Sequence, residues 1–116
     1  MQMLLEFRFK IESLNAIKKA WKYALYRERI EKILPGVIFN SGGVRHFPKA
    51  KVVYTRFAPR PIKDFDNLVG GWKPIQDTLV KANFFPDDST NHIQVEYRQE
   101  KSEEYKVRIK ILGVDE

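Results

Sequence analysis

The stretch "MLLEFRFKIESLNAIKKAWKYALYRERIEKIL", residues 3–34, changes its hydrophobic period part-way along. Its first residues alternate between apolar and charged, which predicts a half-buried strand with one face turned to the core. From Ser13, a favourable N-cap, apolar residues recur at helical spacing, so we expect one amphipathic helix over 14–34, ended by Pro35-Gly36. The core-facing residues are expected to be Leu5, Phe7, Phe9 and Ile11 on the strand, and Leu14, Ile17, Trp21, Ala24, Leu25, Ile30 and Ile33 on the helix.

Together with this first strand and helix, the remaining segments predict the secondary-structure order β-α-β-α-β-β. After a loop with a short strand at 37–39, the pattern predicts a strand over 51–58 and a helix over 74–84. Alternating residues then predict strands over 92–100 and 104–112, joined as a hairpin through the charged "KSEE". We therefore expect a single α+β domain over residues 1–116, with a small mixed sheet and helices packed against it.

Composition excludes several classes of protein. With no cysteine, the chain can form neither disulfides nor thiolate metal sites, which favours a reducing compartment. Charge appears by Glu6, no signal-peptide pattern is present, and no stretch approaches the roughly 18 apolar residues of a membrane span. We expect a cytoplasmic protein. The net charge of +6 permits an anionic partner, and we expect nucleic acid.

Two clusters of carboxylates are candidates for a metal site. In "KDFDN", Asp64 and Asp66 are two residues apart, so in extended chain both point to one side. Asp87 and Asp88 follow in "PDDS". If the clusters converge, their mutual repulsion would be relieved by Mg²⁺ or Mn²⁺, which prefer oxygen ligands. The alternative is structural: Asp66 or Asn67 caps a helix, and the second cluster forms a turn.

Lys73 is a candidate for contacting a phosphate. It precedes Pro74, which disfavours helix at the residue before it, so a helix is expected to begin or kink there. The lysine would then lie close to the first aspartate pair, within reach of a phosphate or a developing negative charge. An ordinary surface lysine is the alternative.

The segments "DFDNL", "WKPIQDTLVKANFFPDDS" and "IQVEYRQEK" together resemble the RusA-type Holliday junction resolvases over roughly residues 50–112. Members of that family are small homodimeric endonucleases of bacteria and their phages. The resemblance implies Mg²⁺- or Mn²⁺-dependent cleavage of four-way DNA junctions. It implies metal ligation by Asp64, Asp66 and Asp88, with Asp87 a weaker candidate, and a catalytic role for Lys73. It suggests Lys63 as a contact to the DNA backbone and Lys73 as a contact to a phosphate. Two further candidate DNA contacts come from this chain's own basic residues: Arg60 and, in the 41–49 loop, Arg45. For that loop, a mobile Gly-rich segment with no such role is the alternative.

The chain departs from the family pattern in two places. Asp66 and Lys73 are farther apart than in the family, and Val69-Gly70-Gly71 looks like the insertion. The N-terminal half passes almost directly from strand to helix, whereas the family has a basic loop there. Two other functions stay open: a non-catalytic DNA-binding protein whose aspartates cap and turn, and a nuclease that acts on flaps or forks.

Overall fold

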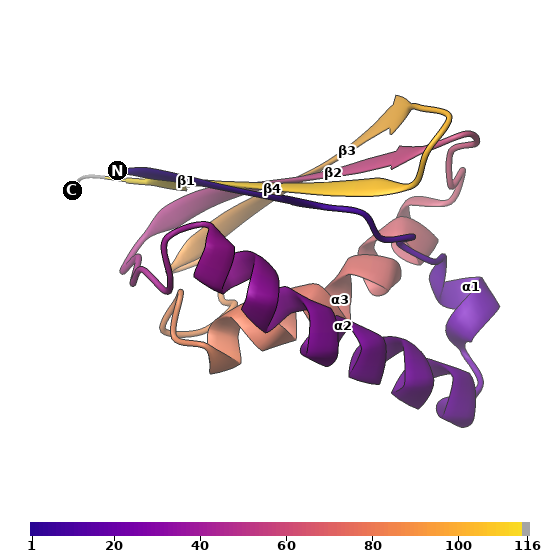
Figure 1. The fold of residues 1–116 in the computed structure, drawn as a ribbon, viewed down its shortest axis with the longest axis horizontal. Helices are drawn as coiled ribbons and strands as arrows, with labels where there is room; N and C mark the ends of the chain where they lie inside the picture. The colour runs from indigo at the N-terminus through magenta and orange to yellow at the C-terminus, as the bar shows by residue number, and fades with distance from the viewer. Residues whose placement is uncertain (115–116) are drawn as a thin grey trace.

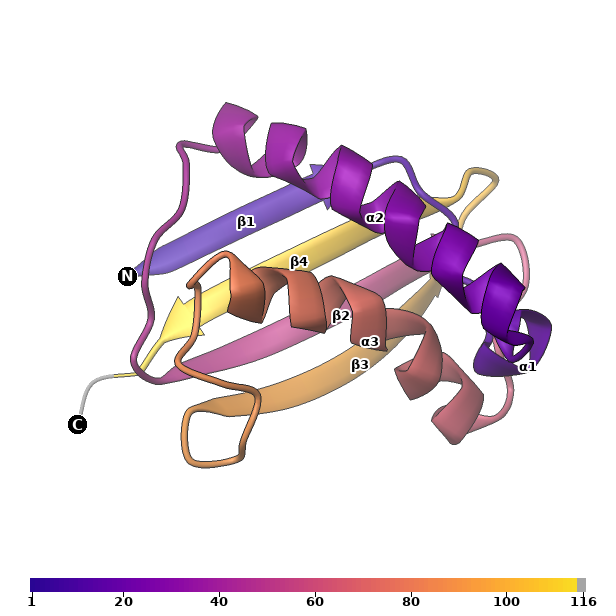
Figure 2. The same ribbon diagram turned by 90° about the horizontal axis from the view of Figure 1, so that it is seen from below.

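A mixed sheet of four strands carries all the helices on one of its faces in the computed structural model, which describes residues 1–114 (Figure 1). The predicted α+β class is confirmed. The elements in chain order are β1 (Gln2–Phe7), α1 (Leu14–Ile17), α2 (Ala20–Asn40), β2 (Ala50–Ala58), α3 (Phe65–Lys81), β3 (Ile93–Lys101) and β4 (Lys106–Gly113). The two long helices, α2 and α3, lie across the same face of the sheet (Figure 2). Within residues 1–114, no helix has the length and apolar character that crossing a membrane requires.

The strand order in the sheet is β1-β4-β2-β3. β4 is antiparallel to both of its neighbours, whereas β2 and β3 are parallel and are connected through α3. The predicted hairpin between the last two strands is therefore wrong, because β2 lies between them. Nearly every residue of β2 is buried, because one side of the strand faces the helices and, on the other side, Lys106 and Arg108 of β4 lie over the Phe57 ring.

The alternation predicted for the first strand is confirmed. Met3 and Leu5 of β1 face the helices, and Leu5 pairs with Ile109 of β4 in the core. The inward face continues past the end of the strand, where Phe9 and Ile11 are also buried. On the opposite face, Glu6 accepts a hydrogen bond from Arg108 Nε at 2.7 Å. Buried and exposed residues therefore alternate along β1, as expected for a half-buried strand at the edge of a sheet.

The helix predicted over 14–34 is divided, and it ends later than predicted. Ser13 Oγ caps the short α1 by accepting from Ala16 N at 3.2 Å. A new helix, α2, then begins at Ala20 and continues through Pro35 to Asn40, so neither the stop at Pro35-Gly36 nor the strand at 37–39 exists. The side of α2 that packs on the sheet carries Tyr26, Ile30, Leu34 and Ile38, whereas four residues predicted to face the core are exposed: Trp21, Ala24, Leu25 and Ile33. Buried apolar residues on both sides of Pro35 outweigh the one helical hydrogen bond that it removes.

The helix predicted to begin at Pro74 is α3, which already begins at Phe65 and includes the Gly70-Gly71 pair. These glycines are sites of close packing. A Cβ atom at position 70 would lie 2.7 Å from Leu14 Cβ, and one at position 71 would overlap the carbonyl oxygen of Glu12. The chain is therefore already helical at these glycines and does not begin a helix at Pro74. The glycines let the segment after β1 lie directly against α3.

Candidate metal and phosphate site

The first aspartate pair lies at the N-terminus of α3. Asp64 is the N-cap, and its Oδ1 accepts a hydrogen bond from Asn67 N at 3.0 Å. The sequence suggested Asp66 or Asn67 for this role, but the cap is Asp64. Asp66 lies in the first helical turn, and both aspartates are exposed. The partial positive charge at a helix N-terminus stabilises carboxylates here even without a cation.

Asn67 fixes this helix start to the N-terminal part of the chain. Its Oδ1 accepts a hydrogen bond from Asn15 N in α1 at 3.0 Å. About one turn farther along α3, Tyr26 Oη of α2 donates to Gly71 O at 2.7 Å. The position of the Asp64–Asp66 segment is thus set by contacts from both preceding helices.

The second half of the site brings Lys73 and Asp88 together. Lys73 Nζ lies 3.6 Å from Asp77 Oδ1, one turn along α3, and 4.0 Å from Asp88 Oδ2 in the loop that follows the helix. All three side chains are partly exposed, so the ammonium group remains accessible to solvent. Sequence spacing alone pointed to Lys73 and Asp88 separately, and the loop after α3 is what brings them close.

Asp87 and Asp88 have different environments. Asp87 Oδ1 accepts from Ser89 N at 2.8 Å, and its Oδ2 lies 3.6 Å from His92 Nε2. The hydrogen bonds from Ser89, followed by the charge of His92, lower the pKa of the Asp87 carboxyl below its ordinary value. Asp87 therefore forms the turn that the structural alternative predicted, whereas the Asp88 carboxylate faces Lys73.

Two tyrosines connect the halves of the site. Burial raises the pKa of Tyr54 on β2, and the charges of Asp77 and Asp88 add to this effect together with Tyr97. Burial, then Asp88, raises the pKa of Tyr97 on β3. The ring of Phe65 meets the Tyr97 ring edge-on at 5.8 Å between centroids. Tyr97 thus contacts Phe65, the residue between the two N-terminal aspartates, and also feels the charge of Asp88.

A groove of about 250 Å³ runs along α3 beside Asp77 and Asp88. Its far wall is formed by α2 through Arg27 and Glu31, which form an ion pair of 3.5 Å. Asp77 is the acidic residue that the sequence reasoning missed. Its i,i+4 spacing from Lys73 on a helix was the signal that could have identified it.

The predicted DNA-contacting residues do not form one cluster. Lys63 is exposed immediately before Asp64, and Arg60 is exposed three residues earlier, where its carbonyl accepts from the buried Arg56 at 2.8 Å. Arg45 is exposed in the loop between α2 and β2, beside His46, whose Nδ1 lies 2.8 Å from Asn83 O beyond the end of α3. Lys63 and Arg45 are therefore near opposite ends of a helix about 25 Å long at 1.5 Å per residue.

The donor groups suit a hard divalent cation, but they are not gathered around one point. Carboxylate oxygens of Asp64, Asp66 and Asp88 are the ligand type that Mg²⁺ and Mn²⁺ take. Nowhere in residues 1–114 do three His, Cys, Asp or Glu side chains converge in an arrangement that could hold a metal ion. Asp64 and Asp66 lie at one end of the site and Asp88 at the other, so a shared ion would have to draw the two halves together.

No family model and no curated protein matched this chain. Among solved structures, a type III plasmid segregation protein, TubZ, is similar with a TM-score of 0.47 and 18% sequence identity. The similarity covers 97% of this chain but only 25% of that protein. A likeness at this level carries no argument about function.

Proposed function

We propose that this protein is a metal-dependent endonuclease that cleaves four-way DNA junctions. The observation that supports the proposal is the approach of Lys73 Nζ to within 4.0 Å of Asp88 Oδ2, alongside the helix that begins with Asp64 and Asp66. These are the four residues for which the resemblance to the RusA-type resolvases implies catalytic roles. The approach needs the tertiary fold, and it is therefore support independent of the sequence motif.

In this proposal, the aspartates hold the metal and the lysine meets the substrate. Asp64, Asp66 and Asp88 would ligate Mg²⁺ or Mn²⁺, since Asp64 uses only one carboxylate oxygen in capping α3. The bound ion would supply Lewis-acid stabilisation and acidify a water molecule. Lys73 would donate to an oxygen of the scissile phosphate, with its ammonium group held in place by Asp77.

Charge on the surface of the protein would collect the DNA. The net charge of +6 favours binding that weakens as salt rises. Arg60 and Lys63 lie just before the proposed metal ligands and Arg45 lies near the other end of α3, so DNA following the helix would meet cations on both sides of the site.

The direct test is Asp66→Asn, assayed on a synthetic four-way junction with Mg²⁺. We expect cleavage to fall by about 100-fold or more, as is typical when an electrostatic group of an active site is removed. Glu103→Gln, an exposed change in the loop between β3 and β4, is the matched control and should retain activity. An Asp66→Asn variant that cleaves at a near wild-type rate would show that the proposed site is wrong.

Metal binding can be measured separately from cleavage. Titration with Mn²⁺ should broaden the NMR signals of residues around Asp64, Asp66 and Asp88 in the wild-type protein, because the ion is paramagnetic. Asp88→Asn should weaken this broadening, whereas Asp87→Asn should largely preserve it, because Asp87 is committed to the turn with Ser89. Equal broadening in the wild type and in Asp88→Asn would remove Asp88 from the site.

A non-catalytic DNA-binding protein is the second candidate. It is favoured by the roles of Asp64 as a helix cap and Asp87 as a turn residue, and by the separation of the carboxylates. This candidate predicts metal-independent binding with no product, and Asp→Asn changes that leave binding intact or tighten it. Comparing cleavage of a junction, a fork, a flap and a plain duplex also tests whether the substrate is a four-way junction.

A further inference from the structure

The outward side of α2 exposes large apolar residues. Trp21 is 61% exposed, Leu25 is 54% exposed and Phe39 is 80% exposed. The opposite side of the same helix is packed on the sheet through Ile30 and Leu34, which are fully buried. The helix therefore has apolar residues on two sides, and those on the outer side are exposed within residues 1–114.

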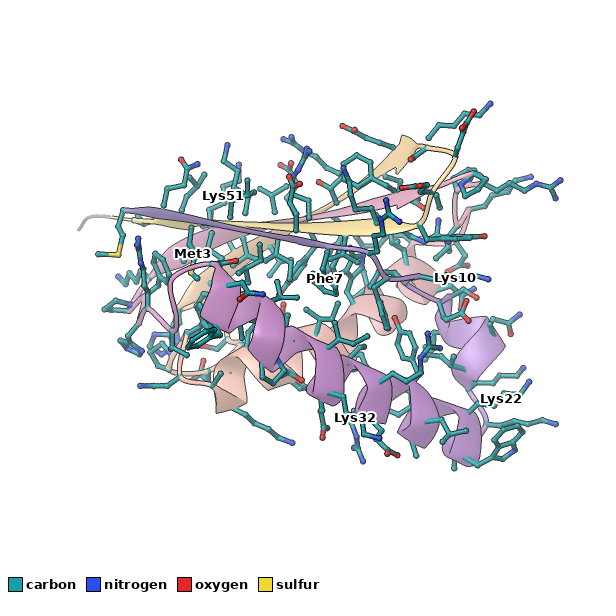
Figure 3. All side chains as sticks on the ribbon, viewed as in Figure 1. Met3, Phe7, Lys10, Lys22, Lys32 and Lys51 are labelled. Atoms are coloured by element: carbon teal, nitrogen blue, oxygen red, sulfur yellow. The ribbon has the colours of Figure 1, made fainter. Side chains whose placement is uncertain are left out.

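The outer residues of α2 follow a heptad spacing. Steps of four and three alternate along Trp21, Leu25, Glu28, Lys32, Pro35 and Phe39, which we call the outer seam. This spacing is the a/d pattern by which two helices pack along their length. Figure 3 shows Lys32 projecting from α2 on the side away from the sheet, so the seam faces solvent.

The outer seam is complementary to itself when two copies run antiparallel. Members of the seam lie in pairs at equal distances on either side of Ile30. If the two outer seams cross at the level of Ile30 along the helix, Trp21 would meet the partner's Phe39, and Leu25 would meet the partner's Pro35. Glu28 would meet the partner's Lys32, so an aromatic pair, an aliphatic pair and a pair of opposite charges follow one another from each end of the contact to its centre.

The central charges are already positioned for this contact. Within one chain, Lys32 Nζ lies 3.0 Å from Glu28 Oε1, and the side chains are 73% and 56% exposed. In an antiparallel pair, two such ion pairs would lie side by side and form a closed group of alternating charges. A polar layer of this kind costs some affinity but specifies one register and one orientation.

Gly36 has no reason within the chain to be glycine. It lies inside α2, and a Cβ atom built on it would meet nothing within 4 Å. Glycine inside a helix is unfavourable relative to alanine, so the residue weakens α2 without relieving a clash. Gly36 is adjacent to Pro35 of the outer seam, where the Leu25 side chain of an antiparallel second copy would approach. A missing side chain there lets the two backbones come close.

We propose that the outer seam is the interface of a homodimer, formed by antiparallel packing of α2 against α2 of a second copy. The proposal does not rest on the nuclease function. A dimer of this kind would nevertheless affect the nuclease function, because the groove beside Asp77 and Asp88 lies on one flank of α2. A two-fold axis between antiparallel helices keeps equivalent flanks together, so both grooves would open on the same side of the dimer.

The first experiment measures the dissociation constant of the full chain by sedimentation equilibrium. Wild type should be dimeric at micromolar concentration, and Leu25→Glu should raise the dissociation constant roughly tenfold or more. Tyr105→Glu, at an exposed residue outside α2, is the control and should leave the constant unchanged. Circular dichroism and thermal unfolding establish that each variant is folded.

Charge reversal tests the register. Lys32→Glu alone places four carboxylates at the centre and should weaken the dimer, as should Glu28→Lys alone. The double variant restores alternating charges and should recover dimerisation to within roughly threefold of wild type. A double variant as weak as either single variant overturns the pairing of Glu28 with Lys32.

Cross-linking tests the orientation, in a chain that contains no cysteine. Under mild oxidation, a mixture of Trp21→Cys and Phe39→Cys should form the mixed disulfide in preference to either symmetric one. A preference for symmetric disulfides overturns the antiparallel arrangement. A wild-type chain that is monomeric at high micromolar concentration overturns the interface altogether, and leaves the seam to another protein or to a lipid surface.

Discussion

Lys73 and Asp88 approach within 4.0 Å across the end of α3, although one lies mid-helix and the other in the loop beyond it. Asp88 lies between Asp87 and Ser89, which form a turn through a hydrogen bond from Ser89 N to Asp87 Oδ1 at 2.8 Å. The same lysine lies 3.6 Å from Asp77, so it is held between two carboxylates while staying exposed. Because the ammonium group of Lys73 is exposed to solvent, it can leave one of these carboxylates and bind a substrate phosphate in its place.

Replacing Lys73 tests its assigned role. Lys73→Met keeps the length of the side chain but removes the charge, and we expect junction cleavage to fall by about 100- to 1,000-fold. Lys81→Met, at the exposed last residue of α3, is the matched control and should cost little. Steady-state kinetics on the junction make the measurement. If both variants lose activity equally, Lys73 acts only through the general charge of the surface.

Replacing Gly71 tests the close packing between α3 and the segment after β1. Gly71→Ala should lower the free energy of unfolding by about 1–3 kcal/mol or more, because the new Cβ overlaps the Glu12 carbonyl. Gly36→Ala, in open space on α2, should instead raise it by about 0.5–1 kcal/mol. Urea denaturation at low protein concentration, where dimerisation does not contribute, gives both values. A Gly71→Ala protein as stable as wild type would contradict the close approach.

Replacing Tyr26 tests how α2 holds α3. The hydroxyl accepts from Glu12 N at 3.2 Å and donates to Gly71 O at 2.7 Å, and burial raises its pKa. Tyr26→Phe leaves both backbone groups without this partner, so we expect a loss of about 1–3 kcal/mol in the free energy of unfolding. Tyr23→Phe, at a half-buried tyrosine one turn away, provides the comparison. Equal effects of the two changes would show that the hydrogen bonds contribute little.

The turn at Asp87 predicts a pH dependence. Because Ser89 lowers the pKa of Asp87 below its ordinary value of 3.8, folding favours the ionised carboxylate. Its contribution to stability is therefore complete above pH 3.8 and is lost as the pH falls through the lowered pKa of the folded state. An NMR titration of the carboxyl carbon should show this low value.

The Ser89→Ala variant identifies the cause of that shift. It removes the hydroxyl that contributes most, so the pKa of Asp87 should move back toward its ordinary value. Thr90→Ala, one residue farther on, should leave the pKa where it is in the wild type. A pKa unchanged by Ser89→Ala would assign the shift to the backbone N–H or to His92 instead.

The features that could be predicted from the sequence are those set by short-range periodicity. Alternation placed Leu5, Phe9 and Ile11 in the core, and the N-cap at Ser13 was correct, because side-chain direction in a strand and satisfaction of a helix start depend on a few neighbouring residues. The mixed sheet and the α+β class followed from the order of such segments. Candidate residues for the site could also be named locally, but the extended chain expected at Asp64 and Asp66 is instead the N-cap and first turn of α3.

The errors have a common physical origin in long-range packing. Local propensity predicts that the first long helix ends at Pro35 and that the next begins at Pro74. In the structure each helix continues through its proline, because burial of Ile38 and Trp72 against the sheet outweighs the lost hydrogen bonds. The last two strands look like a hairpin in sequence, yet the apolar β2 is more stable between them, buried on both faces. Partners such as Lys73 with Asp88, or Gly71 with Glu12, meet only because separate elements dock on one sheet. Contacts of this kind produce no periodic pattern in the sequence, so they cannot be predicted from neighbouring residues.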